Sequence, residues 1–313
     1  MPASIEIPRA NNAVVTIGEQ SVSLTNLDKP FWPDLGITKR DLLQYYADMS
    51  HWLLPHISGR AMVMKRYPGG AYGEFFFQKR APSPRPEWIP ICSIEHASGN
   101  IVDFPVINDV ASLLWVINLG CIDLNQWYAK CDDVDRPDYL HFDLDPVPSA
   151  GFECVIETAL IVREALDALK IKSYPKTTGS KGIHIYVPIV RGPVQKEVWM
   201  FAKELARLLA GRNPKLITAE YKVAKRPKNH VLVDYNQNAW GRTLASVYSV
   251  RPKPHATVST PVTWEEVERG FKMEDFRIDN IRERVRKTGD LYRPLLLKTG
   301  RLNLEKFLKG RAA

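Results

Sequence analysis

The stretch YLHFDLDP, residues 139–146, decides more about the fold than any other part of this 313-residue chain. Its apolar and polar residues alternate, which predicts a β-strand with an apolar core face and a polar, wet face. The polar face would carry His141, Asp143 and Asp145. Two adjacent aspartates repel each other unless a cation lies between them, so they predict a divalent-metal site. The alternative is a solvated strand edge that ends at Pro146, but aspartate is depleted in strands and occurs here twice on one face.

The composition of the chain is that of an ordinary soluble protein. A length of 313 residues and 45% apolar content suit one large domain or two lobes with a real core. No apolar run approaches the length of a membrane span, and the N-terminus lacks the order of a signal peptide. The four cysteines form no C-x-x-C pair, which argues against a zinc site. We therefore expect a cytoplasmic protein with reduced cysteines and no membrane contact.

The positive charge of the chain is concentrated in two segments. The net charge is +8, and the basic residues gather near 222–228 and 282–287. Such clusters suit a polyanion, because Lys and Arg neutralise phosphates and release counterions. The charge favours a nucleic-acid partner, although a solvated basic surface would have the same composition.

Hydrophobic periodicity and capping signals predict a mixture of helices and strands. Strands are expected at 13–17, 22–24, 61–67, 182–187 and 231–234, with a short strand or loop edge at 74–79, and helices at 38–49, from 108 to beyond 115, at 152–169, at 194–210, from 263, and in a basic tail. In the strand at 182–187 we expect His184 and Tyr186 to point outward. We expect Gly211 to end the helix at 194–210. The elements do not alternate as in a doubly wound parallel sheet. An α+β fold with antiparallel or mixed sheets flanked by helices is therefore predicted.

A third aspartate, Asp234, closes the apolar strand at 231–234. Three carboxylates from two strands can hold two divalent ions about 3.5–4 Å apart, as in phosphoryl transfer. Taken alone, Asp234 is better explained as a strand-end or turn residue than as a ligand. Only its combination with Asp143 and Asp145 makes it a candidate ligand.

The loop KTTGSKGIH, residues 176–184, is a candidate phosphate-binding segment between a helix and a strand. Glycines allow close backbone approach to a phosphate, and Thr178, Ser180, Lys181 and His184 would donate hydrogen bonds to it. The alternative is a flexible β-turn with an exposed histidine. Walker spacing is missing, so the loop is not a P-loop.

Two arginines follow Asp234 in the sequence. Arg242 and Arg251 are candidates to meet a triphosphate, because guanidinium binds phosphate bidentately. Either could instead be a surface cation.

Together these motifs resemble the archaeo-eukaryotic primase superfamily, and most closely the polymerase domain of bacterial DNA-repair ligase D and its stand-alone relatives. The resemblance rests on LTNLDK near residue 24, then HFDLDP, TTGSKGIHIY, LVDYNQN and YSVRPKP in that order. It implies a two-lobed primase-like fold over one domain, 1–313. Within it we expect a lead-in and hairpin at 1–24, a catalytic region at 25–255 and a C-terminal helical segment at 256–313.

The resemblance implies a template-dependent nucleotidyltransferase, tolerant of ribonucleotides, that fills gaps or extends ends in double-strand-break repair by non-homologous end joining. Asp143, Asp145 and Asp234 would be both the catalytic residues and the ligands of two Mn²⁺ or Mg²⁺ ions. The nucleotide-binding residues would be Thr178, Ser180, Lys181, His184, Arg251, Arg242 and Asn125. The implied partners are nucleoside triphosphates, DNA ends or gapped duplexes with a 5′-phosphate, a Ku-like protein and a separate ligase. The protein would then be associated with the nucleoid.

The resemblance also implies contacts with the DNA strands. Asn26, Lys29 and Lys39 would hold the 5′-phosphate of a downstream strand, and Phe76 and Phe77 would stack on a template base or the nucleotide. An aromatic face stacks on any base without reading its sequence. For one of the three phenylalanines at 75–77 we expect an ordinary core position.

The sequence departs from the family pattern at Asn125, where the family typically has a histidine. Asparagine can form hydrogen bonds but cannot carry a charge. The affinity for the nucleotide or the metal is therefore expected to differ from that of relatives with histidine at this position. No Lys-x-Asp-Gly ligase motif is found, so strand sealing is expected of another polypeptide or region. Two other functions use the same residues: a metal-dependent nuclease or phosphodiesterase, and a non-catalytic module that binds or bridges DNA ends.

Overall fold

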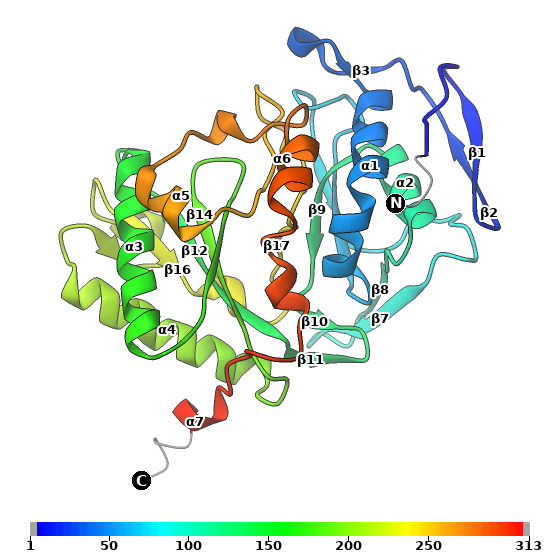
Figure 1. The fold of residues 1–313 in the computed structure, drawn as a ribbon. Helices are drawn as coiled ribbons and strands as arrows, with labels where there is room; N and C mark the ends of the chain where they lie inside the picture. Colours follow the sequence, from blue (N-terminus) through cyan, green and yellow to red (C-terminus); the bar gives the residue numbers. More distant parts are fainter. Residues whose placement is uncertain (1–4, 309–313) are drawn as a thin grey trace. The chain divides into compact units, whose positions relative to one another are not determined.

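The computed structural model describes residues 5–308, and the chain divides into two compact units, each built from several segments (Figure 1). Unit 1 comprises residues 1–127, 245–259 and 276–289, and unit 2 comprises 128–244, 260–275 and 290–313. Residues 1–4 and 309–313, at the ends of the predicted lead-in and C-terminal segment, lie outside the described part. No helix within residues 5–308 is long and apolar enough to cross a membrane.

Unit 1 begins with the predicted hairpin, β1 (Ala13–Ile17) and β2 (Gln20–Leu24). A short ribbon of β3 (Pro30–Trp32) and β4 (Ile37–Thr38), separated by the 3-10 turn η1 (Pro33–Leu35), leads into α1 (Lys39–Ile57). The Thr38 hydroxyl accepts the Asp41 N–H, and the Asp41 carboxylate accepts the Thr38 N–H, so the predicted capping box starts this helix.

The main sheet of unit 1 has the order β17-β9-β5-β6. Its strands are β5 (Met62–Arg66), β6 (Phe76–Gln78), β9 (Cys121–Gln126) and β17 (Leu244–Ala245), and β5 is antiparallel to both β6 and β9. A separate hairpin is formed by β7 (Ile91–Glu95) and β8 (Ile101–Pro105). Helices α2 (Val110–Asn118) and α6 (Ile281–Thr288) pack against α1.

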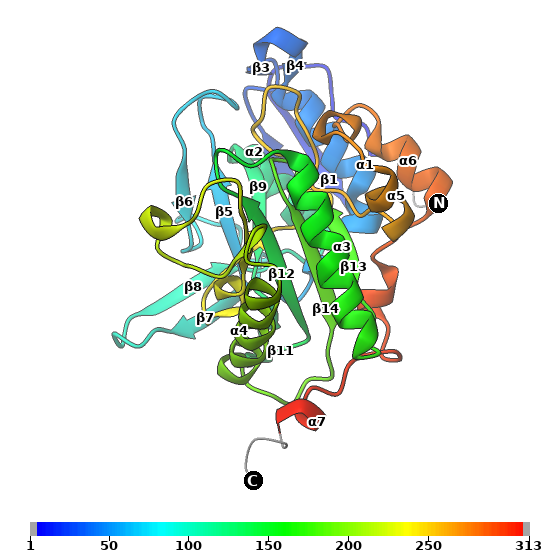
Figure 2. The ribbon, with the colours of Figure 1, turned by 90° about the vertical axis from the view of Figure 1, so that its left-hand side faces the viewer.

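Unit 2 is built around a five-stranded sheet of order β13-β14-β12-β16-β15. The strands are β12 (Tyr139–Pro146), β13 (Tyr174–Thr177), β14 (Ile183–Pro188), β15 (Ile217–Thr218) and β16 (Val231–Asp234). All neighbouring pairs are antiparallel except β15 with β16. Helices α3 (Phe152–Ala168) and α4 (Gln195–Arg212) lie along this sheet (Figure 2). The apolar face of β12 therefore belongs to the core, as its alternation predicts.

The remaining elements of unit 2 are short. They are the hairpin β10 (Ala129–Lys130) and β11 (Asp133–Pro137), helices α5 (Trp264–Arg269) and α7 (Glu305–Leu308), and the 3-10 turns η2 (Val223–Lys225), η3 (Asn236–Asn238), η4 (Met273–Asp275) and η5 (Arg293–Leu296).

Three local predictions were wrong. Gly211 does not end its helix, because α4 continues to Arg212 and the cap is Asn213. The loop 178–182 joins two strands, β13 and β14, rather than a helix and a strand. His184 and Tyr186 lie on the polar face but are each only 3% exposed, because other side chains cover that face.

Candidate active site

A row of charged and polar residues crosses four strands of the unit 2 sheet. Lys176 lies opposite His184, His184 opposite Asp143, and Asp143 opposite Asp234. Directly opposed residues of antiparallel strands point to the same face, so these four side chains share one side of the sheet. Asp145, two residues along β12, lies on that side as well. The structure thus brings together the three predicted carboxylates.

Each carboxylate of the row already contacts protein groups. The Asp143 Oδ1 lies 3.2 Å from the His184 Nε2, and the Asp145 Oδ1 lies 3.1 Å from the Lys181 Nζ. Asp234 accepts the Asn236 backbone N–H at 2.8 Å and the Gln237 side-chain amide at 3.1 Å. Within residues 5–308 no group of three or more His, Cys, Asp or Glu side chains is placed so that it could hold a metal ion.

The electrostatics of the row show that negative charge is crowded there. Asp234 is 8% exposed, and its pKa is raised above 3.8, first by burial and then by the charge of Asp143. The backbone N–H of Asn236 and the charge of Arg226 act in the opposite direction. The carboxyl pair is therefore a place where a cation would be stabilised.

His141 does not lie in solvent as its polar-face position suggested. It is fully buried, and its ring lies 4.1 Å from that of Tyr128 and stacks on that of Tyr186 at 5.4 Å between centroids. Burial, with His184 and Lys176 nearby, lowers the pKa of His141 well below 6.5. The expected wet face is thus covered by aromatic rings at this end, and His141 is uncharged.

The loop between β13 and β14 is held by one hydroxyl. The Thr178 Oγ1 accepts the backbone N–H groups of Ser180, Lys181 and Gly182, at 3.1, 3.2 and 3.1 Å. Gly179 has φ of +64°, which glycine adopts without strain. A Cβ on Gly182 would lie 2.2 Å from the Leu144 carbonyl oxygen. The loop therefore packs closely against β12, and this brings the Lys181 side chain into contact with Asp145.

Of the predicted nucleotide-binding residues, five are in unit 2 and two are in unit 1. Arg242 is exposed in the segment after η3. Asn125 lies on β9 of unit 1, where its side-chain amide donates to the Asp123 carbonyl at 3.2 Å. Arg251 is also in unit 1, and its Nε lies 2.7 Å from the Asp123 Oδ1.

Asp123 is a residue that the sequence analysis missed. It is 2% exposed and carries ion pairs with Arg251 and, at 3.8 Å, with Lys65. A charged residue inside the apolar run of β9 requires a buried partner, which was the available signal. Lys176, 1% exposed on the polar row, was also given no role.

The predicted 5′-phosphate residues lie close together in unit 1. The Lys39 backbone N–H donates to the Lys29 carbonyl, and Lys29 and Arg66 are near enough to influence the charge of Lys39. Burial first, and then these two cations, lower the pKa of Lys39 to about 8. Asn26, at φ of +54°, lies in the turn before Lys29, and its N–H donates to the Asn12 side chain.

The phenylalanines at 75–77 are all exposed, at 51%, 45% and 59%, so the expectation that one belongs to the core was wrong. The Phe75 ring has the Lys65 Nζ 3.9 Å from its centroid, and Phe76 has the Arg66 guanidinium at 5.2 Å. These cation–π contacts, of Lys65 with Phe75 and of Arg66 with Phe76, stabilise the strand edge while the rings stay exposed.

Comparison with known proteins identifies the family. The family model described as "LigD, primase-polymerase domain" matches residues 38–292. The chain belongs to this family. It is similar to the multifunctional non-homologous end joining protein LigD of Mycolicibacterium smegmatis, with 34% identity over 88% of this chain and 36% of the relative. The bifunctional LigD of Bacillus subtilis is 31% identical over 87% of this chain and 44% of the relative.

A solved structure supports the same conclusion for the fold. The polymerase domain of Mycobacterium tuberculosis ligase D, determined in complex with DNA, matches with a TM-score of 0.82 and 29% identity, over 88% of this chain and 98% of that domain. The predicted family and the α+β fold with mixed and antiparallel sheets are confirmed. As a LigD primase-polymerase domain, the chain is a nucleotidyltransferase. It spans less than half the length of the curated relatives that it matches.

Proposed function

We propose that this chain extends the 3′-hydroxyl of a primer, directed by a template, at gapped or broken DNA ends during non-homologous end joining. The observation that carries the proposal is the register that sets Asp143 opposite Asp234 on the polar face of the unit 2 sheet. Family membership and the DNA complex of the similar M. tuberculosis domain support a DNA substrate. The proposed domain is the whole of 1–313, with 25–255 as its catalytic region.

Asp143, Asp145 and Asp234 would hold two divalent ions, Mn²⁺ or Mg²⁺. Carboxylate oxygens are the donors that these hard cations prefer, and the raised pKa of Asp234 reflects charge that a cation would neutralise. When bound, such ions lower the pKa of an attacking hydroxyl and neutralise a leaving pyrophosphate. Asp145 would exchange its contact with Lys181 for this role.

The chain's own residues would bind and orient the substrates. Thr178 shapes the 178–182 loop by accepting the backbone N–H groups of Ser180 and Lys181. The Ser180 hydroxyl and the Lys181 ammonium group of this loop, together with His184, would hold the triphosphate. Arg242, Arg251 and Asn125 would add further nucleotide contacts. Asn26, Lys29 and Lys39 would bind the downstream 5′-phosphate, and Phe76 and Phe77 would stack on a base.

The wider repair role is also part of the proposal. The relatives named LigD are multifunctional or bifunctional end-joining proteins, and this chain matches only part of each. A Ku-like end-binding protein and a DNA ligase would therefore be its partners at the break. Action on DNA ends would place the protein at the nucleoid.

Primer extension on a gapped duplex with a 5′-phosphate tests the proposal. The chain is supplied with nucleoside triphosphates and Mn²⁺, and the double variant Asp143→Ala, Asp145→Ala is compared with the wild type. We expect extension by the wild type only. Extension by the double variant at the wild-type level would contradict the assignment, and release of nucleotides from DNA without triphosphates would indicate a nuclease instead.

A further inference from the structure

Unit 2 contains a cavity of about 490 Å³ that the proposed function does not use. It is lined by the first turn of α4, by Asp135 of β11 and by the segment that follows η3, which contributes Trp240. One wall, Trp199, donates its indole N–H to the Asn236 side chain at 3.0 Å. Because the Asn236 backbone N–H donates to Asp234, the cavity wall is two hydrogen bonds away from the polar row.

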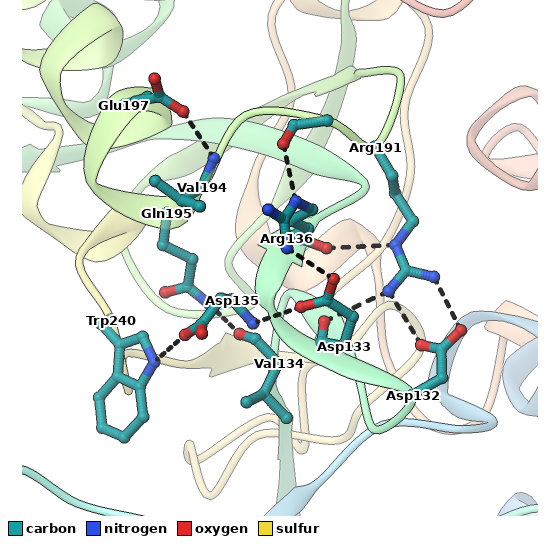
Figure 3. A network of polar contacts seen from close by, with 11 residues as sticks. Asp132, Asp133, Val134, Asp135, Arg136, Arg191, Val194, Gln195, Glu197 and Trp240 are labelled. Atoms are coloured by element: carbon teal, nitrogen blue, oxygen red, sulfur yellow. Dashed lines mark hydrogen bonds and ion pairs between the residues drawn. The ribbon is translucent and has the colours of Figure 1, made fainter.

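Trp240 gives the cavity a fixed aromatic platform. The side chain is 37% exposed, yet its indole N–H donates to the Asp135 Oδ1 at 3.0 Å (Figure 3). An exposed indole that is anchored at its polar edge loses little conformational freedom when a flat ligand stacks on it. A planar, aromatic ligand is therefore favoured.

Gln195 gives the cavity a buried hydrogen-bond acceptor. The side chain is 4% exposed, and its Nε2 donates to the Val134 carbonyl at 3.0 Å, which fixes the orientation of the amide. The Gln195 Oε1 is buried and has no hydrogen-bond partner among residues 5–308. A ligand N–H that reaches this oxygen would satisfy an acceptor that is otherwise costly to leave unpaired. Figure 3 shows the amide beside Asp135 and Trp240.

The charges around the cavity separate two kinds of ligand. An aromatic platform with acceptors would also suit an arginine side chain of a partner protein. However, Lys196 is exposed at the cavity, and the Lys203 Nζ already lies 4.4 Å from the Trp199 ring centroid. These ammonium groups repel a second cation and attract a phosphate. A base attached to a phosphate fits these two ammonium groups better, and the Asp135 carboxylate in the lining is engaged by the Trp240 N–H.

We propose that this cavity binds an unpaired nucleobase that carries an exocyclic amino group. The base would stack on Trp240, its amino group would donate to the Gln195 Oε1, and its phosphate would lie near Lys196. Adenine, cytosine and guanine carry such a group, and thymine does not. The ligand is either a single-stranded DNA segment or a free nucleotide. The inference concerns binding alone, so it stands or falls independently of nucleotidyl transfer.

Binding to short labelled homopolymers of dA, dC and dT, measured by fluorescence anisotropy with the full chain and without metal or triphosphates, tests this site. We expect tighter binding of dA and dC than of dT. Trp240→Ala should weaken dA binding by about five- to hundredfold, the usual effect of removing one stacking ring. Leu208→Ala, which truncates a 48% exposed residue of α4 outside the cavity, is the matched control and should have no effect.

Competition identifies the source of the base. Displacement of the dA homopolymer by dAMP at comparable base concentration indicates a nucleotide site, and failure of dAMP to compete indicates a single-stranded DNA site. Equal affinity of the wild type for dA, dC and dT, with Trp240→Ala unchanged, would overturn the proposal.

Two further measurements keep the test decisive if Trp240→Ala does not fold. Trp240→Phe retains a stacking ring, so dA binding should persist while the part of the tryptophan fluorescence quenched by dA is lost. Gln195→Leu should reduce the preference for dA over dT towards unity. Quenching of equal amplitude in Trp240→Phe and wild type would contradict stacking at this site.

Discussion

Asp143 of β12 lies directly opposite Asp234 of β16, while on its other side it lies opposite His184 of β14. Burial first, and then the charge of Asp143, raise the pKa of Asp234 above its ordinary value. A fold that keeps such a pair at the centre of a sheet sacrifices stability for a local negative charge. Functional sites commonly show this pattern.

Asp234→Asn should therefore change activity and stability in opposite directions. Loss of a carboxylate from the proposed ligand set should lower primer extension at least about hundredfold, comparable to removal of a group that stabilises transition-state charge. The melting temperature should rise, because the amide still accepts the Asn236 N–H without repelling Asp143. Asp132→Asn, at an exposed carboxylate paired with Arg191, should leave extension unchanged. A lower melting temperature for Asp234→Asn would contradict the repulsion.

The stability difference between Asp234→Asn and wild type should depend on pH. A carboxyl whose pKa is raised on folding binds its proton more tightly in the folded state, so its contribution to stability falls as pH rises through the folded-state pKa. The gain in free energy of unfolding of Asp234→Asn over wild type should be smallest below pH 3.8, the ordinary pKa of an aspartate. It should grow as pH rises through the folded-state pKa of Asp234 and then level off. Denaturant unfolding of both proteins across this range measures it, and an advantage that shrinks with rising pH would contradict the sign.

Gly182→Ala should destabilise the sheet beside the site. Its Cβ would lie 2.2 Å from the Leu144 carbonyl oxygen, a backbone atom that can move only with β12, so a loss of about 3 kcal/mol is expected. Gly211→Ala is the matched control, because this glycine lies within α4 and its Cβ would meet nothing within 4 Å. That control should gain about 1 kcal/mol. Equal effects in denaturant unfolding would argue against the close approach.

Thr178→Val should loosen the loop that we assign to the triphosphate. The substitution removes the oxygen that accepts three backbone N–H groups while preserving the shape of the side chain. We expect KM for the nucleotide to rise about tenfold, equivalent to about 1.4 kcal/mol, with a smaller change in kcat. Thr178→Ser keeps the oxygen and should behave like wild type. An unchanged KM in Thr178→Val would remove this loop from nucleotide binding.

Binding of a 5′-phosphate should weaken as pH rises through about 8. Burial and the neighbouring Lys29 and Arg66 lower the pKa of Lys39 to about 8, so its charge is lost above that pH, unlike that of an ordinary lysine. Affinity of wild type for 5′-phosphorylated gapped DNA should fall between pH 7 and about 9, relative to the unphosphorylated duplex. Lys39→Arg retains its charge and should not show this loss. The same pH profile in both proteins would contradict a role for Lys39.

The sequence predicted the strand elements of the site better than their surroundings. Alternation in residues 139–146 places Asp143 and Asp145 on one face, and alternation depends only on local backbone geometry. The burial of His141 could not be predicted in this way, because it depends on Tyr128 and Tyr186 from other strands. The pairing of Asp143 with Asp234 is similarly a matter of register between distant segments.

Other differences also depend on contacts between segments that are distant in the sequence. Gly211 is tolerated inside α4 because packing of the helix on the sheet outweighs the low helix propensity of glycine. The exposure of Phe75, Phe76 and Phe77 could not be inferred from apolarity, since an apolar run reads first as core. The charge of Asp123 inside the apolar run of β9 was a signal in the sequence, but its partners, Arg251 and Lys65, are known only from the structure.

The central claim is that the Asp143–Asp234 pair is the cation-binding centre for nucleotidyl transfer, and anomalous diffraction from crystals grown with Mn²⁺ and a nucleoside triphosphate tests it most directly. We predict manganese signals within about 2.0–2.6 Å of carboxylate oxygens of both Asp143 and Asp234, with Asp145 released from Lys181. A bound nucleotide with its manganese held elsewhere, and neither aspartate within that distance, would contradict the account.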